Sequence, residues 1–227
     1  MHNIEKNIIQ VRAQIQQAAA LYDRNPKLIS LLAVSKKKPV EDIRLAYAAG
    51  QRDFGENFVQ EAEQKRRVLT DLDIIWHFIG PVQSNKTRVL AEGFDWVHSV
   101  DRLKVAERLS AQRPATLPAL NICIQVNVDR EASKSGVMLE EVATLAESIS
   151  TLPRIRLRGL MAIPAQYDDL ESQRLPFARL RETLEDLQQR GLDCDTLSTG
   201  MSHDLQAAIA EGSTLVRIGT AIFGERT

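Results

Sequence analysis

Three consecutive lysines, Lys36, Lys37 and Lys38, stand between an apolar run at residues 31–35 and Pro39. A lysine at the end of a buried strand can become a nucleophile, because partial desolvation and neighbouring ammonium groups both favour its neutral amine. The chemistry indicated for Lys36 is Schiff-base formation with a carbonyl compound, and the alternative is ordinary solvated surface charge. Strand alternation puts Lys36 and Lys38 on one side, so we expect Lys38, more than Lys37, to lower the pKa of Lys36.

Two later segments carry the features of an anion site. The run Ser-Thr-Gly-Met-Ser at residues 198–202 follows an expected strand and precedes an expected helix, so backbone N–H groups and the hydroxyls of Ser198 and Ser202 converge there. Gly219 and Thr220 offer a second set of amides after the last strand. Either loop alone could hold only a helix cap or a turn, but together with Met201 they favour a phosphate group.

A Schiff-base lysine facing a phosphate site gives two anchor points for pyridoxal 5'-phosphate (PLP). Class I sugar-phosphate aldolases use the same pair of groups, so these anchors alone do not name the ligand. Arg217 stands beside the expected phosphate site and could donate to the pyridine nitrogen of PLP. Because a guanidinium donates and never accepts, that nitrogen would stay unprotonated and the cofactor would be a poor electron sink.

Three further residues stand at or near the ends of expected strands. Asn57 either contacts the cofactor or caps the helix that begins near Phe58, and Met161, at the end of the sixth strand, is expected to contact the cofactor. His77, between two aromatic residues, is expected to be a core histidine or a contact to the cofactor face, and the alternative is a catalytic base. The four histidines show no metal-ligand spacing with Cys123 or Cys194, so we expect no metal site.

The elements that would position these residues alternate regularly along the chain. The first two dozen residues have apolar side chains at helical spacing, namely Ile4, Ile8, Val11, Ile15, Ala18 and Leu21. Eight strands are expected at residues 28–35, 52–54, 74–79, 95–99, 119–128, 155–161, 195–198 and 214–218. Helices are expected between them at residues 40–49, 58–69, 86–92, 102–110, 139–150, 170–190 and 203–211. This alternation predicts an α/β fold, a single (β/α)8 TIM-type barrel, with the N-terminal helix packed on the barrel beside the eighth strand.

Composition sets the remaining expectations. The 227 residues carry 29 Lys and Arg against 30 Asp and Glu, which favours neither nucleic-acid nor membrane binding. No linker divides the chain, so we expect one domain over residues 1–227. Two cysteines make no disulfide framework, and no secretion signal or membrane-spanning run is evident, so a cytoplasmic monomer with a small-molecule partner is expected.

The motifs at these strand ends resemble those of the pyridoxal phosphate homeostasis protein family (YggS/PROSC). In chain order they are AVSK at 33–36, FGEN at 54–57, WHFIGP at 76–81, QSNK at 83–86, SKSG at 133–136, RGLM at 158–161, LS at 197–198 with GMS at 200–202, and VRIGT at 216–220 with FG at 223–224. The resemblance covers nearly the whole chain. Lys37, Phe58 and His203 depart from the usual pattern, which has a small polar residue, a tyrosine and an acidic residue there.

The resemblance implies a fold-type III PLP-binding barrel like the N-terminal domain of alanine racemase. It implies an internal aldimine between PLP and Lys36, with the ring nitrogen at Arg217 and Asn57 beside the cofactor. The phosphate would lie at Ser198, Met201, Ser202, Gly219 and Thr220. The implied role is intracellular vitamin B6 homeostasis, with effects on amino-acid and keto-acid balance and no accepted enzymatic activity; PLP-dependent apoenzymes are the implied recipients.

Three functions stay open at this point. A cofactor-binding protein is favoured because a two-base racemase needs a second acid-base group opposite the lysine. Tyr22 and Tyr47 lie on expected helices, Tyr167 lies in a loop, and no second domain closes the site. The alternative is a low-activity PLP-dependent amino-acid racemase using Lys36 with His77, His203 or water. The third is a class I aldolase that works without PLP.

Overall fold

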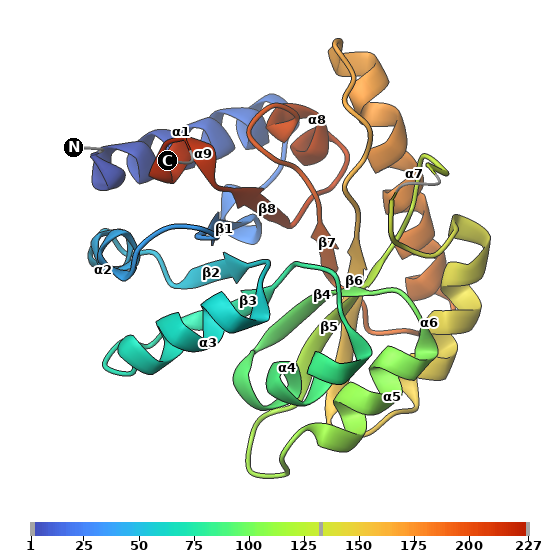
Figure 1. The fold of residues 1–227 in the computed structure, drawn as a ribbon. Coiled ribbons are helices and arrows are strands. Elements are labelled where there is room, and N and C mark those ends of the chain that lie inside the picture. The colour runs from blue at the N-terminus through green and yellow to red at the C-terminus, as the bar shows by residue number, and fades with distance from the viewer. Residues whose placement is uncertain (1–2, 132–133, 226–227) are drawn as a thin grey trace.

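Eight parallel strands form a closed barrel in which each strand pairs with the next along the chain and β8 pairs with β1 (Figure 1). The computed structural model describes residues 3–131 and 134–225. Within them the strands are β1 (Ser30–Val34), β2 (Asp53–Glu56), β3 (Ile75–Phe78), β4 (Trp96–Val100), β5 (Leu120–Gln125), β6 (Ile155–Met161), β7 (Thr196–Ser198) and β8 (Leu215–Ile218). All eight expected strands are therefore confirmed, as is the barrel.

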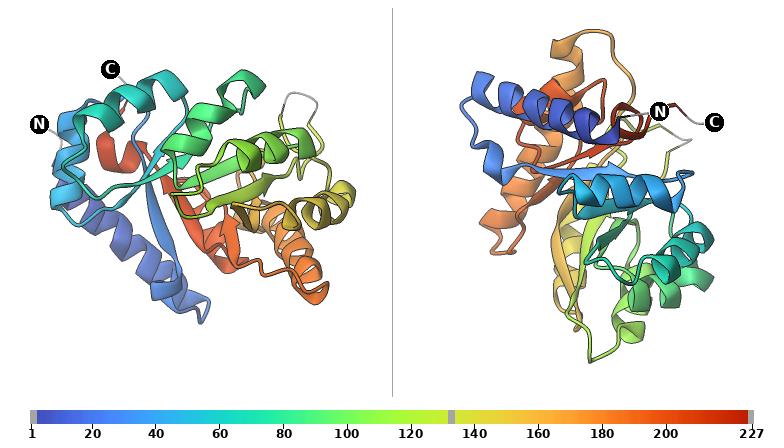
Figure 2. Two further views of the ribbon diagram at one scale, coloured as in Figure 1. Left: turned by 90° about the horizontal axis from the view of Figure 1, so that it is seen from below. Right: turned by 90° about the vertical axis from the view of Figure 1, so that its left-hand side faces the viewer.

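Helices follow the strands and cover the outside of the barrel (Figure 2). The α-helices are α1 (Ile4–Leu21), α2 (Val40–Ala48), α3 (Val59–Val68), α4 (Thr87–Gly93), α5 (Leu103–Gln112), α6 (Val142–Ser150), α7 (Leu170–Gln189), α8 (Leu205–Ala210) and α9 (Thr220–Phe223). Short 3-10 helices are η1 (Pro26–Leu28), η2 (Ser84–Lys86) and η3 (Leu139–Glu141). Helix α8 starts two residues later than expected, and α9 was not expected because four residues show no helical periodicity.

The first helix closes the outer layer where a normal eighth helix would lie. Helix α1 packs against α2, α8 and α9, and its buried face joins the main core. The Asn7 amide donates to the carbonyl of Ile222 over 2.8 Å, which ties α1 to α9. The expectation that this helix packs beside the eighth strand is confirmed, except that Leu21 is 64% exposed and does not belong to the buried stripe.

Two neighbouring isoleucines of α1 test how much this packing contributes. Ile8 is 1% exposed and Ile9 is 61% exposed. Replacing Ile8 by alanine removes buried methyl groups and leaves a cavity, so we expect a loss of about 2–5 kcal/mol in the free energy of unfolding. Ile9→Ala is the matched control, with an expected change within about 0.5 kcal/mol. Urea unfolding of both variants measures the difference, and equal losses would contradict the packing of α1.

No helix in residues 3–131 and 134–225 combines the length and apolarity needed to cross a membrane.

Candidate functional site

A cavity of about 400 Å³ opens at the carboxyl ends of the strands. Its lining brings together seven residues that the sequence analysis singled out, namely Lys36, Asn57, Met201, Ser202, Arg217, Gly219 and Thr220. Lys38 and His203 also line it, as do Ile163 and Gln166 from the loop after β6. The carboxyl ends of parallel strands meet at one face of a barrel, which is why residues nearly 200 positions apart share this cavity.

A buried ion pair lies behind residues 35–39, the loop between β1 and α2 that carries the three lysines (the lysine loop). The Lys65 ammonium, on α3, donates to Glu56 Oε1 and to the carbonyl oxygen of Ser35, both over 2.7 Å. The Ser35 hydroxyl donates to the same carboxylate oxygen over 2.7 Å. Burial raises the pKa of Glu56, and the Lys65 charge with both hydrogen bonds opposes that rise. The residue immediately before Lys36 is thus fixed by both its hydroxyl and its carbonyl.

The residue after Lys36 is held by the same helix. Glu61, one turn before Lys65, accepts from the Lys65 ammonium over 2.6 Å and from the backbone N–H of Lys37. Lys37 has φ +60°, the left-handed conformation that side chains with a Cβ adopt at a cost. Its side chain is exposed, whereas Lys36 and Lys38 are partly buried and line the cavity. The backbone on both sides of Lys36 is therefore anchored to α3.

Asn57 enters the cavity without serving as a helix cap. Phe58 is the N-cap of α3 and makes no side-chain capping bond. The Asn57 Oδ1 atom is buried and has no hydrogen-bond partner among the described residues. Gly80, after β3, packs so closely that a Cβ there would lie 2.0 Å from the Asn57 carbonyl oxygen. Asn57 therefore has a backbone packed against Gly80 and a buried side-chain oxygen without a partner among the described residues.

The anion site has fewer available amides than the sequence suggested. The backbone N–H of Met201 donates to the Asp204 carboxylate over 2.5 Å, so the expectation of a free amide there is wrong. Asp204, rather than Ser202, is the N-cap residue of α8. Ser202 and Thr220 are exposed at the rim, and Gly219 is the N-cap residue of α9. The first N–H groups of a helix have no partner within the helix. The backbone N–H groups of Gly219 and Thr220 therefore stay candidates for binding a phosphate.

Arg217 forms the floor of the cavity. Its Nη1 donates to the Ser198 carbonyl oxygen and to Ser198 Oγ, the latter over 3.0 Å, and its Nη2 donates to the Ala162 carbonyl oxygen over 2.8 Å. Burial lowers the pKa of Arg217 to about 10, with the Asp204 charge opposing that change. The guanidinium is therefore charged near neutral pH and held in one orientation.

Three expected site residues lie outside the cavity lining. Ser198 is buried and contacts Arg217. His77 is buried in the barrel, where its ring contacts Asp53 and His98. Met161 is 0% exposed. The lining of this cavity does not include these three residues, and their contact with the cofactor stays a prediction.

Sequence reasoning missed Lys65, Glu61 and His98. Glu61 and Lys65 have the i, i+4 spacing that usually marks a solvated helix face, and nothing in the spacing shows that Lys65 is buried. No cluster of metal-ligating residues occurs in the described parts of the chain. Cys123 and Cys194 are buried free thiols. The SKSG motif begins at Ser133, which lies outside the described residues.

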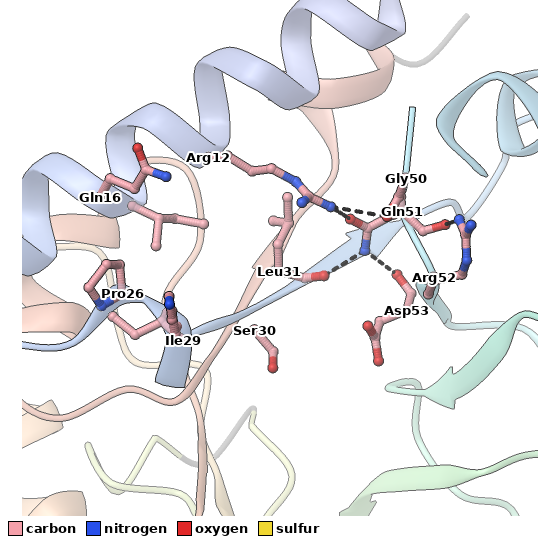
Figure 3. Close-up of a pocket in the computed structure, with 12 residues that line it drawn as sticks. Arg12, Gln16, Pro26, Ile29, Ser30, Leu31, Gly50, Gln51, Arg52 and Asp53 are labelled. Carbon is pink, nitrogen blue, oxygen red and sulfur yellow. Dashed lines mark hydrogen bonds between the residues drawn. The ribbon is translucent and has the colours of Figure 1, made fainter. Parts of the chain in front are cut away.

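A second cavity, of about 410 Å³, lies at the opposite end of the barrel between α1, η1 and the amino ends of β1 and β2 (Figure 3). Gln51 donates there to the carbonyls of Leu31 and Asp53, and Arg12 donates to Gln51. This cavity contains none of the expected site residues.

Comparison with known proteins agrees with this geometry. Residues 6–227 match the family model described as alanine racemase, N-terminal domain. The chain is 59% identical over 226 residues to the pyridoxal phosphate homeostasis protein of Pseudomonas aeruginosa, covering 100% of this chain and 97% of that protein. It is similar to the structure of PipY of Synechococcus elongatus with PLP bound, with a TM-score of 0.86, 38% identity, and coverage of 97% of this chain and 100% of PipY.

A more distant structure, alanine racemase of Corynebacterium glutamicum, shares the fold. Its TM-score is 0.73 at 17% identity, and the alignment covers 98% of this chain and 61% of the racemase. The full-length matches above are far closer in sequence, and the chain therefore belongs to the pyridoxal phosphate homeostasis protein family.

Proposed function

We propose that this chain, as one domain, binds PLP in the cavity at the carboxyl ends of the strands and acts in vitamin B6 homeostasis. The observation that carries the proposal is the convergence of Lys36, Arg217 and the Ser202, Gly219 and Thr220 rim on one cavity. The buried Asn57 Oδ1, which has no partner among the described residues, also fits an absent ligand. The PLP-bound PipY relative and the names of the close relatives support the same ligand.

Each residue then has a defined task. PLP supplies an aldehyde that condenses with a primary amine, and Lys36 offers that amine from a backbone anchored to α3. Arg217 donates to the ring nitrogen and, since it cannot accept, keeps that nitrogen unprotonated. Ser202, Gly219 and Thr220 bind the phosphate, with Met201 beside them. Ser198 accepts a hydrogen bond from Arg217 and so orients it, and the buried side chains of His77 and Met161 pack beneath the site.

Mass spectrometry after borohydride reduction tests this assignment. Reduction in the presence of PLP is expected to trap a covalent adduct on the peptide that contains Lys36, and Lys36→Ala is expected to abolish it. Lys104→Ala, at an exposed lysine of α5, is the control and retains the adduct. Protein that takes up no PLP would refute the proposal and favour the aldolase alternative, and an adduct on another lysine would refute the role of Lys36.

We further propose that the chain holds and releases PLP more than it performs catalysis. Tyr167, the tyrosine in the loop after β6, does not serve as a second base in this cavity. Its hydroxyl donates a hydrogen bond to Asp129 over 3.1 Å, and the residue does not line the cavity. His77 is buried away from the cavity and cannot reach a substrate there. Ser202 and Thr220 at the rim of the cavity are exposed, so a small amine from solvent would be able to approach Lys36.

One observation supports the racemase alternative. His203 lines the same cavity as Lys36, and its Nε2 lies 3.4 Å from the Asp204 carboxylate. A racemase built on these two groups would convert L-alanine to D-alanine, and both Lys36→Ala and His203→Asn would stop it. We expect no conversion above the rate of free PLP.

The recipients that we propose are PLP-dependent apoenzymes in the cytoplasm, with the chain acting as a monomer. Loaded protein mixed with an apoenzyme and a trap for free PLP tests direct transfer. Activity that appears faster than PLP is released into the trap supports it, and activity limited by that release contradicts it.

The two lysines after Lys36 are expected to differ in their effect on PLP attachment. Lys38 lines the cavity and its ammonium donates to the carbonyls of Phe223 and Glu225 over 3.0 and 2.7 Å, whereas Lys37 is exposed. Removing a positive charge from the cavity that Lys36 lines favours the protonated form of Lys36. Lys38→Ala should therefore move the midpoint of adduct formation to higher pH, and Lys37→Ala should move it less. Equal midpoints, read from absorbance titrations, would contradict this prediction.

A further inference from the structure

A chain of hydrogen bonds crosses the inside of the barrel from Arg217 to Asp53. Arg217 Nη1 lies 3.0 Å from Ser198 Oγ, which lies 2.8 Å from His98 Nδ1. His98 Nε2 lies 2.9 Å from His77 Nδ1, and His77 Nε2 lies 3.0 Å from Asp53 Oδ1. Because β4 and β7 are not neighbours in the barrel, the contact between His98 and Ser198 spans its interior.

The chemistry of the two ends fixes the direction of every bond. Arg217 only donates, so Ser198 Oγ accepts from it and passes its own hydrogen to His98 Nδ1. His98 then carries its hydrogen on Nε2 and donates to His77 Nδ1. His77 likewise carries its hydrogen on Nε2 and donates to the Asp53 carboxylate. With both imidazoles neutral, only this arrangement pairs every hydrogen in the chain.

The surroundings of His98 favour its neutral imidazole. Burial lowers the pKa of His98 well below its usual range, and the charge of Arg217 acts in the same direction. The His77 ring stacks on Trp96, with ring centroids 5.4 Å apart, and Arg158 lies on that indole 4.7 Å from its centroid. A second hydrogen on His77 would make its Nδ1 a donor to His98 Nε2, so the hydrogen of His98 would move to Nδ1. The buried Ser198 hydroxyl hydrogen would then have no acceptor in this chain of bonds.

One end of the chain reaches solvent. The Asp53 side chain is 30% exposed and lies in the second cavity, beside Ser30 and Leu31 at the amino end of the barrel (Figure 3). The three members between the ends, His77, His98 and Ser198, are each at most 1% exposed. A buried polar group without a partner is costly. Reversing one of these hydrogen bonds would leave such a group, so all of them keep the same direction from one end of the chain of bonds to the other.

We propose that Asp53, His77 and His98 form a one-directional relay that positions Arg217 through Ser198. They are positioning residues, since Arg217 alone of this set lines the cofactor cavity. Fixing the Ser198 lone pair directs Arg217 Nη1, while the Ala162 carbonyl directs Nη2. The effect on PLP rests on the proposed function, but the proton positions on the two rings do not.

The first test needs no cofactor. Nitrogen-15 NMR of the histidine rings in full-length protein at neutral pH is expected to show both His77 and His98 as neutral rings with hydrogen on Nε2. An imidazolium, or hydrogen on Nδ1, at either ring would overturn the relay. This measurement stands even if the protein takes up no PLP.

The second test separates positioning from general stability. Ser198→Ala removes the hydroxyl group that links His98 to Arg217. Ser110→Ala is the control, because Ser110 on α5 is also buried and its hydroxyl donates a hydrogen bond to the Pro153 carbonyl. We expect Ser198→Ala to raise the Kd for PLP about tenfold and to shift the absorption band of bound PLP. We also expect it to change the nitrogen-15 signals of the His77 ring, which Ser198 does not contact. Ser110→Ala should change none of these. If both variants bind PLP alike with unchanged spectra, the relay is wrong while the proposed function remains.

Discussion

Lys65→Met is expected to reduce the free energy of unfolding by about 3–5 kcal/mol, because it leaves a buried carboxylate without its cation. Lys65 and Glu56 are 6% and 0% exposed in their side chains and 2.7 Å apart. The same change frees the Ser35 carbonyl, so the backbone before Lys36 loses an anchor. Urea unfolding measures the stability, and the rate of PLP adduct formation reports on the lysine loop, which we expect to react more slowly.

The stability of Lys65→Met should also depend on pH in a defined direction. Burial raises the pKa of Glu56 above its ordinary value of 4.5, and Lys65 opposes that rise in the native chain. Without Lys65 the folded state binds the Glu56 proton more tightly than the unfolded state does. Stability is then highest below the ordinary value and falls as the pH rises toward the raised pKa.

A surface ion pair provides the control for Lys65. Arg44 and Asp71 are paired over 2.7 Å, but their side chains are 41% and 58% exposed. Arg44→Met is therefore expected to cost about 0–1 kcal/mol and to leave adduct formation unchanged. If Lys65→Met cost no more than Arg44→Met, the Lys65 cluster would not hold the lysine loop as described.

Gly80→Ala is expected to reduce the free energy of unfolding by about 1–3 kcal/mol and to weaken PLP binding. The added methyl group would lie 2.0 Å from the Asn57 carbonyl oxygen, a contact that only a backbone shift relieves. That shift moves Asn57 in the cavity, so we expect the Kd for PLP to rise about tenfold through loss of one hydrogen bond. Isothermal titration of the variant with PLP measures the change.

Gly50→Ala supplies the comparison for Gly80. Gly50 has φ +86° and open space around the position of a Cβ. Alanine there costs roughly 1–2 kcal/mol of backbone strain at the end of the barrel remote from PLP. Unchanged PLP affinity in Gly50→Ala and loss in Gly80→Ala would tie the effect to Asn57. An equal affinity in both variants would contradict the packing of Gly80 against Asn57.

The sequence was most informative where one physical rule decides the outcome. Apolar runs bounded by helical periodicity gave all eight strands, since parallel strands are covered on both faces. The ends of those strands then located Lys36, Asn57 and Arg217 in one cavity, because a parallel barrel collects its carboxyl ends on one face.

Side-chain direction and competition between polar groups could not be read from the sequence. His77 lies near a strand end, but a shift of one residue decides whether a side chain faces the interior or the rim. The sequence indicated that the backbone N–H of Met201 could bind an anion, but this N–H donates to the Asp204 carboxylate, a contact that depends on the conformation of the loop. Lys65 looked like a solvated lysine, and only the packing of α3 on the barrel buries it.

Helix α1 supports α9, the short helix that begins at the proposed phosphate contacts Gly219 and Thr220. Helix α9 has four residues, too few to be stable alone, and it is held by Asn7 of α1 on one side and by Lys38 on the other. Local opening of α1 is therefore expected to release α9, so that the two helices open as one cooperative unit. We expect amide hydrogen exchange in α1 and α9 to rise together, and a variant that loosens α1 to release PLP faster if Gly219 and Thr220 bind its phosphate as proposed.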